Sequence, residues 1–75
     1  MTATQAEVLR ALGSGVVMAL ELIRLPGVPR GSMVLVRLRD KGFVEVDERD
    51  ACKLTPTGAR ALELWDELVE LEETR

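Results

Sequence analysis

Five basic residues in the middle of the chain are the side chains best suited to bind an anion. Residues 24–41 contain these five bases and one acid, Asp40, which gives a net charge of +4. Residues 59–75 contain two bases and six acids, a net of −4, although the whole chain carries only −3. This separation predicts one face for an anionic partner and another face with a different role. The five bases are Arg24, Arg30, Arg37, Arg39 and Lys41.

Catalytic chemistry has few residues to use in this sequence. It contains no histidine and no tyrosine, and Cys52 is its one cysteine. A thiol without a histidine partner is a poor nucleophile and cannot assemble a zinc site alone, so we expect no enzyme, no metal and no cofactor. We interpret Cys52 as a small, half-buried strand residue.

The same cysteine bears on location, because a single thiol excludes an internal disulfide and suits a reducing compartment. The first residues lack the basic and apolar regions of a signal peptide. No apolar run approaches the roughly 20 residues that span a bilayer. A cytoplasmic protein that does not bind membranes is therefore expected.

The length predicts one small domain over residues 1–75, which buries about 60% of its unfolded surface. Thr4 and Glu7 fit a capping box at the start of a first helix, which Gly13 would end. Ser14 would cap a second helix. The apolar stripe expected on that second helix is Val16, Val17, Leu20 and Ile23.

A Pro/Gly-rich segment, LPGVPRG, ends the second helix, because each proline disfavours helical backbone in the residue before it. A third helix is predicted from Gly31 or Ser32 to Lys41, with Gly42 as its stop. Two helices joined by such a short turn form a helix-turn-helix. The third helix should turn Leu35 and Leu38 inward.

A hairpin and a final helix complete the predicted order. Residues 43–47 and 51–54 are expected to form two strands, with a turn at 48–50. Thr55 and Pro56 read as N-cap and first residue of a helix over residues 56–73. The predicted class is mainly α with a small β-hairpin (α+β), in winged helix-turn-helix order.

Two stretches, RGSMVLVRLRDKGFVEV and KLTPTGARALEL, resemble the PadR group of winged-helix transcription regulators, with MarR-type regulators close behind. The shared pattern is a Gly-Ser helix start, a Lys-Gly-Phe step into the wing and a Leu-Thr-Pro-x-Gly opening of the last helix. The resemblance covers about residues 13–64 and implies binding of double-stranded DNA. The matching residues are Gly31, Ser32, Leu38, Lys41, Gly42, Phe43, Val44, Glu45, Leu54, Thr55, Pro56 and Gly58.

With its leucines buried, the third helix would present its opposite face to DNA. Arg37 is the best candidate to read a base, because a guanidinium can bond guanine O6 and N7 together. Arg49 at the wing tip suits a narrow minor groove, although the acids beside it oppose phosphate contact. The predicted DNA-binding residues are Arg30, Ser32, Met33, Val36, Arg37, Arg39, Lys41, Arg49 and Lys53.

The last helix carries two apolar stripes, of which one suffices to pack it on its own domain. The second stripe predicts the same helix of another copy as its partner. We interpret Trp65 as an anchor in the core or the dimer seam, and the sequence gives no support for a small-molecule effector. The predicted dimer interface is Leu64, Trp65, Leu68 and Leu71.

These features predict a homodimeric repressor that binds a palindromic or pseudo-palindromic operator. The alternative is a non-catalytic winged-helix module that binds protein through Met33, Val36 and the wing. Salt separates the two hypotheses, because phosphate contacts weaken steeply as salt rises and apolar contacts do not.

Overall fold

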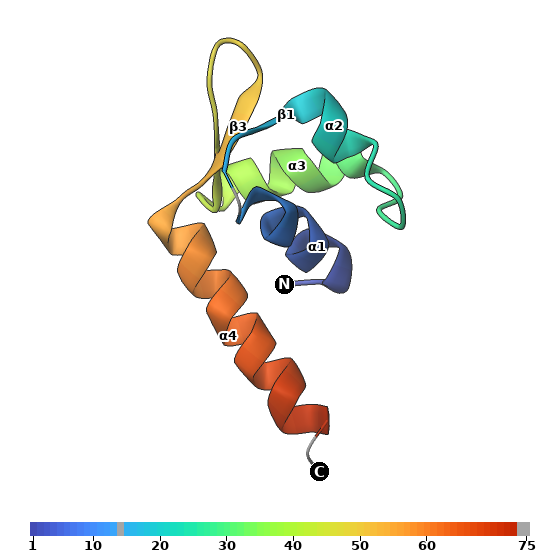
Figure 1. Ribbon diagram of the computed structural model, residues 1–75, viewed down its shortest axis with the longest axis vertical. Coiled ribbons are helices and arrows are strands. Elements are labelled where there is room, and N and C mark those ends of the chain that lie inside the picture. The colour runs from blue at the N-terminus through green and yellow to red at the C-terminus, as the bar shows by residue number, and fades with distance from the viewer. Residues whose placement is uncertain (14, 74–75) are drawn as a thin grey trace.

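The computed structural model describes residues 1–13 and 15–73 of the chain. Within these residues there are four helices and a small three-stranded antiparallel sheet, whose hairpin projects from the end of the molecule opposite to α4 (Figure 1). This confirms the predicted α+β class with mainly helical content. In chain order the elements are α1 (Ala3–Leu12), β1 (Val17–Met18), α2 (Ala19–Ile23), α3 (Gly31–Asp40), β2 (Val44–Val46), β3 (Ala51–Leu54) and α4 (Pro56–Glu73).

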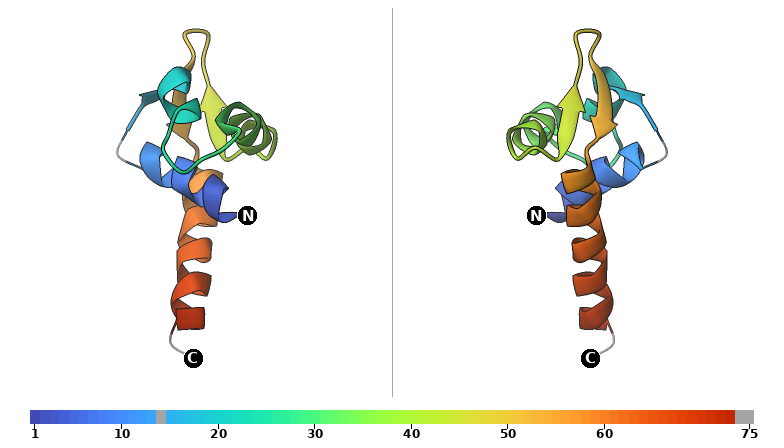
Figure 2. Two further views of the ribbon diagram at one scale, coloured as in Figure 1. Left: turned by 90° about the vertical axis from the view of Figure 1, so that its right-hand side faces the viewer. Right: turned by 90° about the vertical axis from the view of Figure 1, so that its left-hand side faces the viewer.

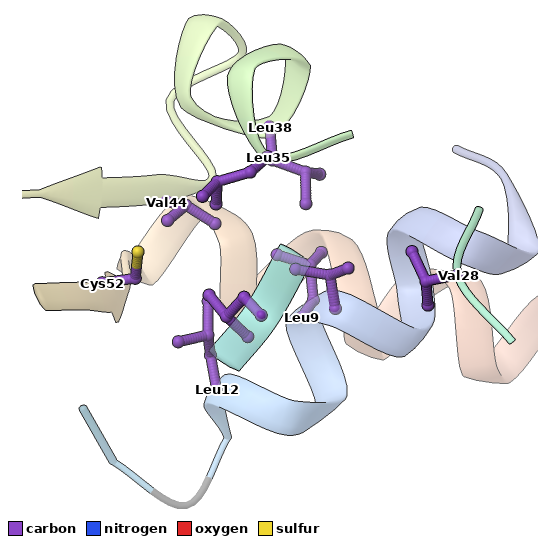
Figure 3. Packing of buried hydrophobic residues seen from close by; sticks show 9 residues of the cluster. Leu9, Leu12, Val28, Leu35, Leu38, Val44 and Cys52 are labelled. Carbon is purple, nitrogen blue, oxygen red and sulfur yellow. The ribbon is translucent and has the colours of Figure 1, made fainter. Parts of the chain in front are cut away.

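One hydrophobic core joins α1, α2, α3 and the sheet. Leu35 and Leu38 point inward from α3, as predicted, and Leu38 is completely buried. Figure 3 shows them above Leu9 and Leu12 of α1. Burial of each such side chain stabilises the fold by about 1.5–3 kcal/mol. The side of α3 that carries these two leucines is therefore fixed against the core.

The first helix begins earlier than predicted, so the capping box expected at Thr4 and Glu7 was wrong. Thr2 is the N-cap: its Oγ1 accepts from the Gln5 N–H, and its own N–H donates to Gln5 Oε1, both at 3.2 Å. Gln5 is buried, and a neutral amide in this position avoids burying a charge. Gly13 ends α1 as predicted, although in a right-handed conformation with φ −61°.

The second helix is shorter than predicted, because Val17 and Met18 form strand β1. They pair with Cys52 and Ala51 of β3, and β-branched valine favours this strand conformation. The Ala19 N–H then donates to the Asp50 carbonyl oxygen at 2.7 Å, and α2 starts at this residue.

The apolar stripe expected on the second helix was correct only in part, since Val17 and Ile23 pack against the core. Val16 and Leu20 are more than half exposed, whereas Leu22 fills the core. A helix of only five residues presents a single turn to its neighbours, which leaves room for one buried leucine. The predicted cap, Ser14, lies outside the described residues.

The hairpin and its turn were predicted correctly, and β3 lies in the centre of the sheet between β1 and β2. Cys52 of β3 has Val17 on one side and Val46 on the other. It is completely buried, so the expectation of half burial was wrong. Its side chain belongs to the hydrophobic core that covers one face of the sheet, which explains the deeper position.

The predicted last helix is confirmed as α4, which extends well beyond the rest of the molecule (Figure 1). Thr55 is its N-cap, since its Oγ1 accepts from the Gly58 N–H at 3.0 Å. Farther along, Asp66 Oδ1 accepts from Arg10 Nη2 of α1 at 2.6 Å. Among the described residues, none of the helices has the combined length and apolar character of a membrane-spanning segment.

Candidate functional site

The solvent side of α3 is the surface on which most predicted contact residues lie. Met33 and Val36 are 51% and 45% exposed, and helical spacing places them with Asp40 along the centre of this side. By the same spacing Arg37 lies on one flank and Arg39 on the other. The surface therefore has an apolar centre with one acid and a base on each flank.

Close packing of α2 on α3 sets the position of this surface. A Cβ added to Gly31 would lie 2.5 Å from the carbonyl oxygen of Ile23, so only glycine allows the two helices to approach this closely. Arg30 precedes α3 in the left-handed region, with φ 56°, and its carbonyl oxygen accepts from the Met33 and Val34 N–H groups. The Arg30 side chain is thereby placed at the start of α3.

A hollow of about 190 Å³ lies between the start of α1 and α3. We call it the α1–α3 hollow. Figure 2 shows the N-terminus and α3 on the same side of the molecule. No sequence pattern predicted that these two segments meet, because nothing local relates the first five residues to α3. The hollow is lined by Thr2, Thr4, Gln5, Pro29, Arg30, Met33, Val34 and Arg37.

Lys41 lines a different part of the surface from Arg30 and Arg37. Its Nζ lies 5.9 Å from the centre of the Phe43 ring, within cation–π range. Both residues line a groove of about 300 Å³ along α4, here called the α4 groove. Its other lining residues are Met1, Ala61, Leu64, Trp65 and Leu68.

The hairpin presents Arg49 at its tip, and its acids differ in role. The Asp47 carboxylate accepts from the Arg49 N–H at 2.8 Å and the Ala51 N–H at 3.0 Å, so it organises the turn. Asp50 adopts φ 62°, which closes the turn. Lys53 pairs across the strands with Glu45. Each hairpin base therefore has an acid beside it in the sequence or across the strands, whereas no acid lines the α1–α3 hollow.

The predicted dimer stripe is exposed along α4. Leu64, Leu68 and Leu71 are each at least half exposed, while Trp65 is partly buried. The other stripe includes Leu62, which packs against the core. The two faces of α4 thus differ as the sequence pattern indicated.

Cys52 is held as a neutral thiol. Burial raises its pKa above the ordinary value of 9.0, and the carboxylates of Asp50 and Asp47 raise it further. No three histidine, cysteine or acidic side chains converge as metal ligands within residues 1–13 and 15–73.

Comparison with protein-family models, with curated proteins and with solved structures gave no match to this chain. The candidate functional surfaces are the solvent side of α3 with the α1–α3 hollow, the hairpin tip and the α4 groove.

Proposed function

We propose that the chain is a winged helix-turn-helix protein that binds double-stranded DNA and regulates transcription as a homodimeric repressor. One observation carries the proposal: α3 is anchored by Leu35 and Leu38 while its solvent side is flanked by Arg37 and Arg39. The order of elements, with a hairpin directly after α3, supports it. So does the resemblance to PadR-like regulators.

In this proposal α3 enters the major groove. Its ten residues span about 15 Å, and an α-helix fits the width of that groove. Arg30 and Arg39 contact phosphates, which sets affinity and orientation. Ser32, Met33 and Val36 face base edges, where the apolar side chains suit thymine methyl groups.

The dimer in this proposal forms through α4. A small domain gains stability by covering apolar surface, and Leu64 and Leu68 offer such a surface in the lining of the α4 groove. Two-fold symmetry then requires a palindromic or pseudo-palindromic operator. The acids of α4 repel phosphates and keep this end of the dimer away from DNA.

The test is selection of bound sequences from random duplex DNA, followed by titration of the selected duplex at several salt concentrations. We expect one sequence with two-fold symmetry, bound by a constant that falls steeply with salt. Arg39→Ala should weaken binding, whereas Arg60→Ala on α4 should not. The proposal fails if no duplex is enriched at low salt.

A second candidate is a winged-helix module that binds another protein. The exposed Met33 and Val36, with Asp40 beside them, favour it, because apolar residues at the centre of a face are typical of protein interfaces. Binding would then survive high salt, and Met33→Ser with Val36→Ser would abolish it. The flanking arginines favour DNA over this alternative.

A further inference from the structure

Two arginines share the α1–α3 hollow without any acid in its lining. Arg30 comes from the turn before α3 and Arg37 from its second turn. In the part of the chain that the structure describes, neither guanidinium forms an ion pair. Like charges gathered in this way repel each other, and an anion between them would relieve the repulsion.

The opposite wall of the hollow adds hydroxyl groups. Thr2 Oγ1 and Thr4 Oγ1 lie 3.1 Å apart and share one hydrogen bond. Only one hydroxyl hydrogen is used in that bond, so the other is available to a further acceptor. Guanidinium and hydroxyl donors together are the groups that bind phosphate oxygens in protein–DNA complexes.

The hollow also has suitable dimensions. Its volume of about 190 Å³ corresponds to about six water molecules at roughly 30 Å³ each, which leaves room for a phosphate group. Residues of α3 line it together with the start of α1. A phosphate bound there would border the duplex that α3 contacts.

We propose that the α1–α3 hollow binds one phosphate group of the DNA backbone, and that Arg37 is a phosphate ligand and not a base reader. This inference rests on the proposed DNA binding and changes the role expected for Arg37 from the sequence. Arg30 and Arg37 hold the phosphate from the α3 side, and the Thr2 and Thr4 hydroxyls face it from α1. Sequence recognition is then left to Ser32, Met33 and Val36.

The first experiment measures Arg37→Ala, Arg37→Lys and the control Arg60→Ala on the selected duplex and on a panel with single base-pair changes. Loss of one phosphate contact reduces the slope of log K against log salt concentration by about 0.9. At 0.1 M salt this corresponds to a loss of about fivefold to tenfold in affinity. We expect Arg37→Ala to show this loss uniformly across the panel. Arg37→Lys should retain much of the affinity, because lysine binds phosphate as a point charge but cannot form the fork to guanine.

The second experiment replaces single phosphates of the duplex by neutral methylphosphonates. One position in each half-site should weaken the wild-type protein and Arg60→Ala. The same replacement should add little to the loss already caused by Arg30→Ala or Arg37→Ala. Thermal melting of each variant checks that the fold is retained.

Two outcomes would overturn the inference and leave DNA binding intact. One is an Arg37→Ala variant that has lost discrimination at a single base pair, since this assigns Arg37 to a base. The other is a methylphosphonate scan in which no position depends on Arg30 and Arg37.

If no duplex binds, the proposed function itself has failed, and the hollow is tested directly with inorganic phosphate. Phosphate should then shift the backbone NMR signals of Thr4 and Gln5 and the Nε signals of Arg30 and Arg37. It should not shift those signals in a variant with both arginines changed to alanine. Absence of these shifts in the wild type would overturn the site.

Discussion

The hydroxyl group of Thr55 donates a 2.6 Å hydrogen bond to the carbonyl oxygen of Gly42. The same oxygen atom of Thr55 accepts from the Gly58 N–H. One side chain therefore joins the end of α3 to the first turn of α4. The Thr55 N–H also donates to the Phe43 carbonyl oxygen at 3.1 Å, so the junction is held by backbone and side chain together.

Replacing Thr55 by valine removes both hydroxyl bonds and keeps the shape of the side chain. Loss of a helix cap costs about 0.5–2 kcal/mol, and the bond to Gly42 adds about 1 kcal/mol. We expect Thr55→Val to lower the free energy of unfolding by about 1–3 kcal/mol in urea titration. Thr57→Val, in an exposed position of the same turn, is the control and should change it by less than 1 kcal/mol. Equal effects of the two variants would contradict this role.

Gly58 is required by the close approach of α4 to Phe43. A Cβ at this position would lie 2.1 Å from the Phe43 carbonyl oxygen, which is backbone and does not move freely. Gly58→Ala should therefore destabilise the fold by about 1–3 kcal/mol or more. Gly13→Ala is the matched control, because its backbone is right-handed and it should change stability by about 1 kcal/mol at most. If Gly58→Ala left the stability of the fold unchanged, α4 would have to be able to move away from Phe43.

The Asp47 carboxylate serves the hairpin turn as an acceptor, which an amide can replace. Asp47→Asn should keep the stability within about 0.5 kcal/mol, whereas Asp47→Ala should lose about 1 kcal/mol in thermal melting. If the hairpin tip lies near DNA, Asp47→Asn should also raise affinity for the selected duplex at low salt. Equal melting of the two variants would show that the turn does not need this acceptor.

Cys52 predicts a loss of stability at alkaline pH. Its pKa in the fold is raised above 9.0, so the native state retains the thiol proton more strongly than the unfolded chain. The contribution of the protonated Cys52 thiol to the free energy of unfolding is fully present below pH 9. It is lost as the pH rises through the pKa that Cys52 has in the folded state. Cys52→Ala should be less stable at neutral pH, yet lose less of its remaining stability between pH 9 and 11. Urea titration at both pH values measures this difference.

The exposed stripe of α4 predicts self-association. Leu68→Glu places a charge in the proposed seam and should convert a dimer to a monomer in sedimentation equilibrium. Glu70→Gln, on the opposite side of α4 by helical spacing, is the control and should leave the dimer unchanged. A wild-type monomer at all concentrations would refute the dimer without affecting the α1–α3 hollow.

The elements after Gly31 were predictable because their boundaries are encoded locally. Gly42 adopts φ 78°, a conformation that favours glycine, and it stops α3 where the sequence indicated. The Thr55-Pro56 pair starts α4 through a side chain three residues from its partner. Such signals need no knowledge of the rest of the chain.

The features that were missed depend on contacts between distant residues. The two residues of β1 obtain their pairing from β3, so the sequence around Val17 shows only apolar spacing that also fits a helix. The α1–α3 hollow likewise joins Thr2 and Thr4 to a helix much later in the chain. The spacing of apolar residues indicates which face of a single helix or strand is buried, but it does not indicate which helices and strands pack together.

Because α4 extends away from the domain, its length sets the direction and the distance of its exposed leucines relative to the core. Leu62 fixes it to the core, while Leu64 and Leu68 lie on its exposed side, and the angle between these sides is set by 100° per residue. One residue inserted after Leu62 would turn the exposed stripe by about 100°. Four residues would nearly restore its direction and shift it outward by about 6 Å. In the proposed dimer, the spacing of the two copies, and hence of their half-sites, would therefore depend on the length of α4 alone, with α3 unchanged.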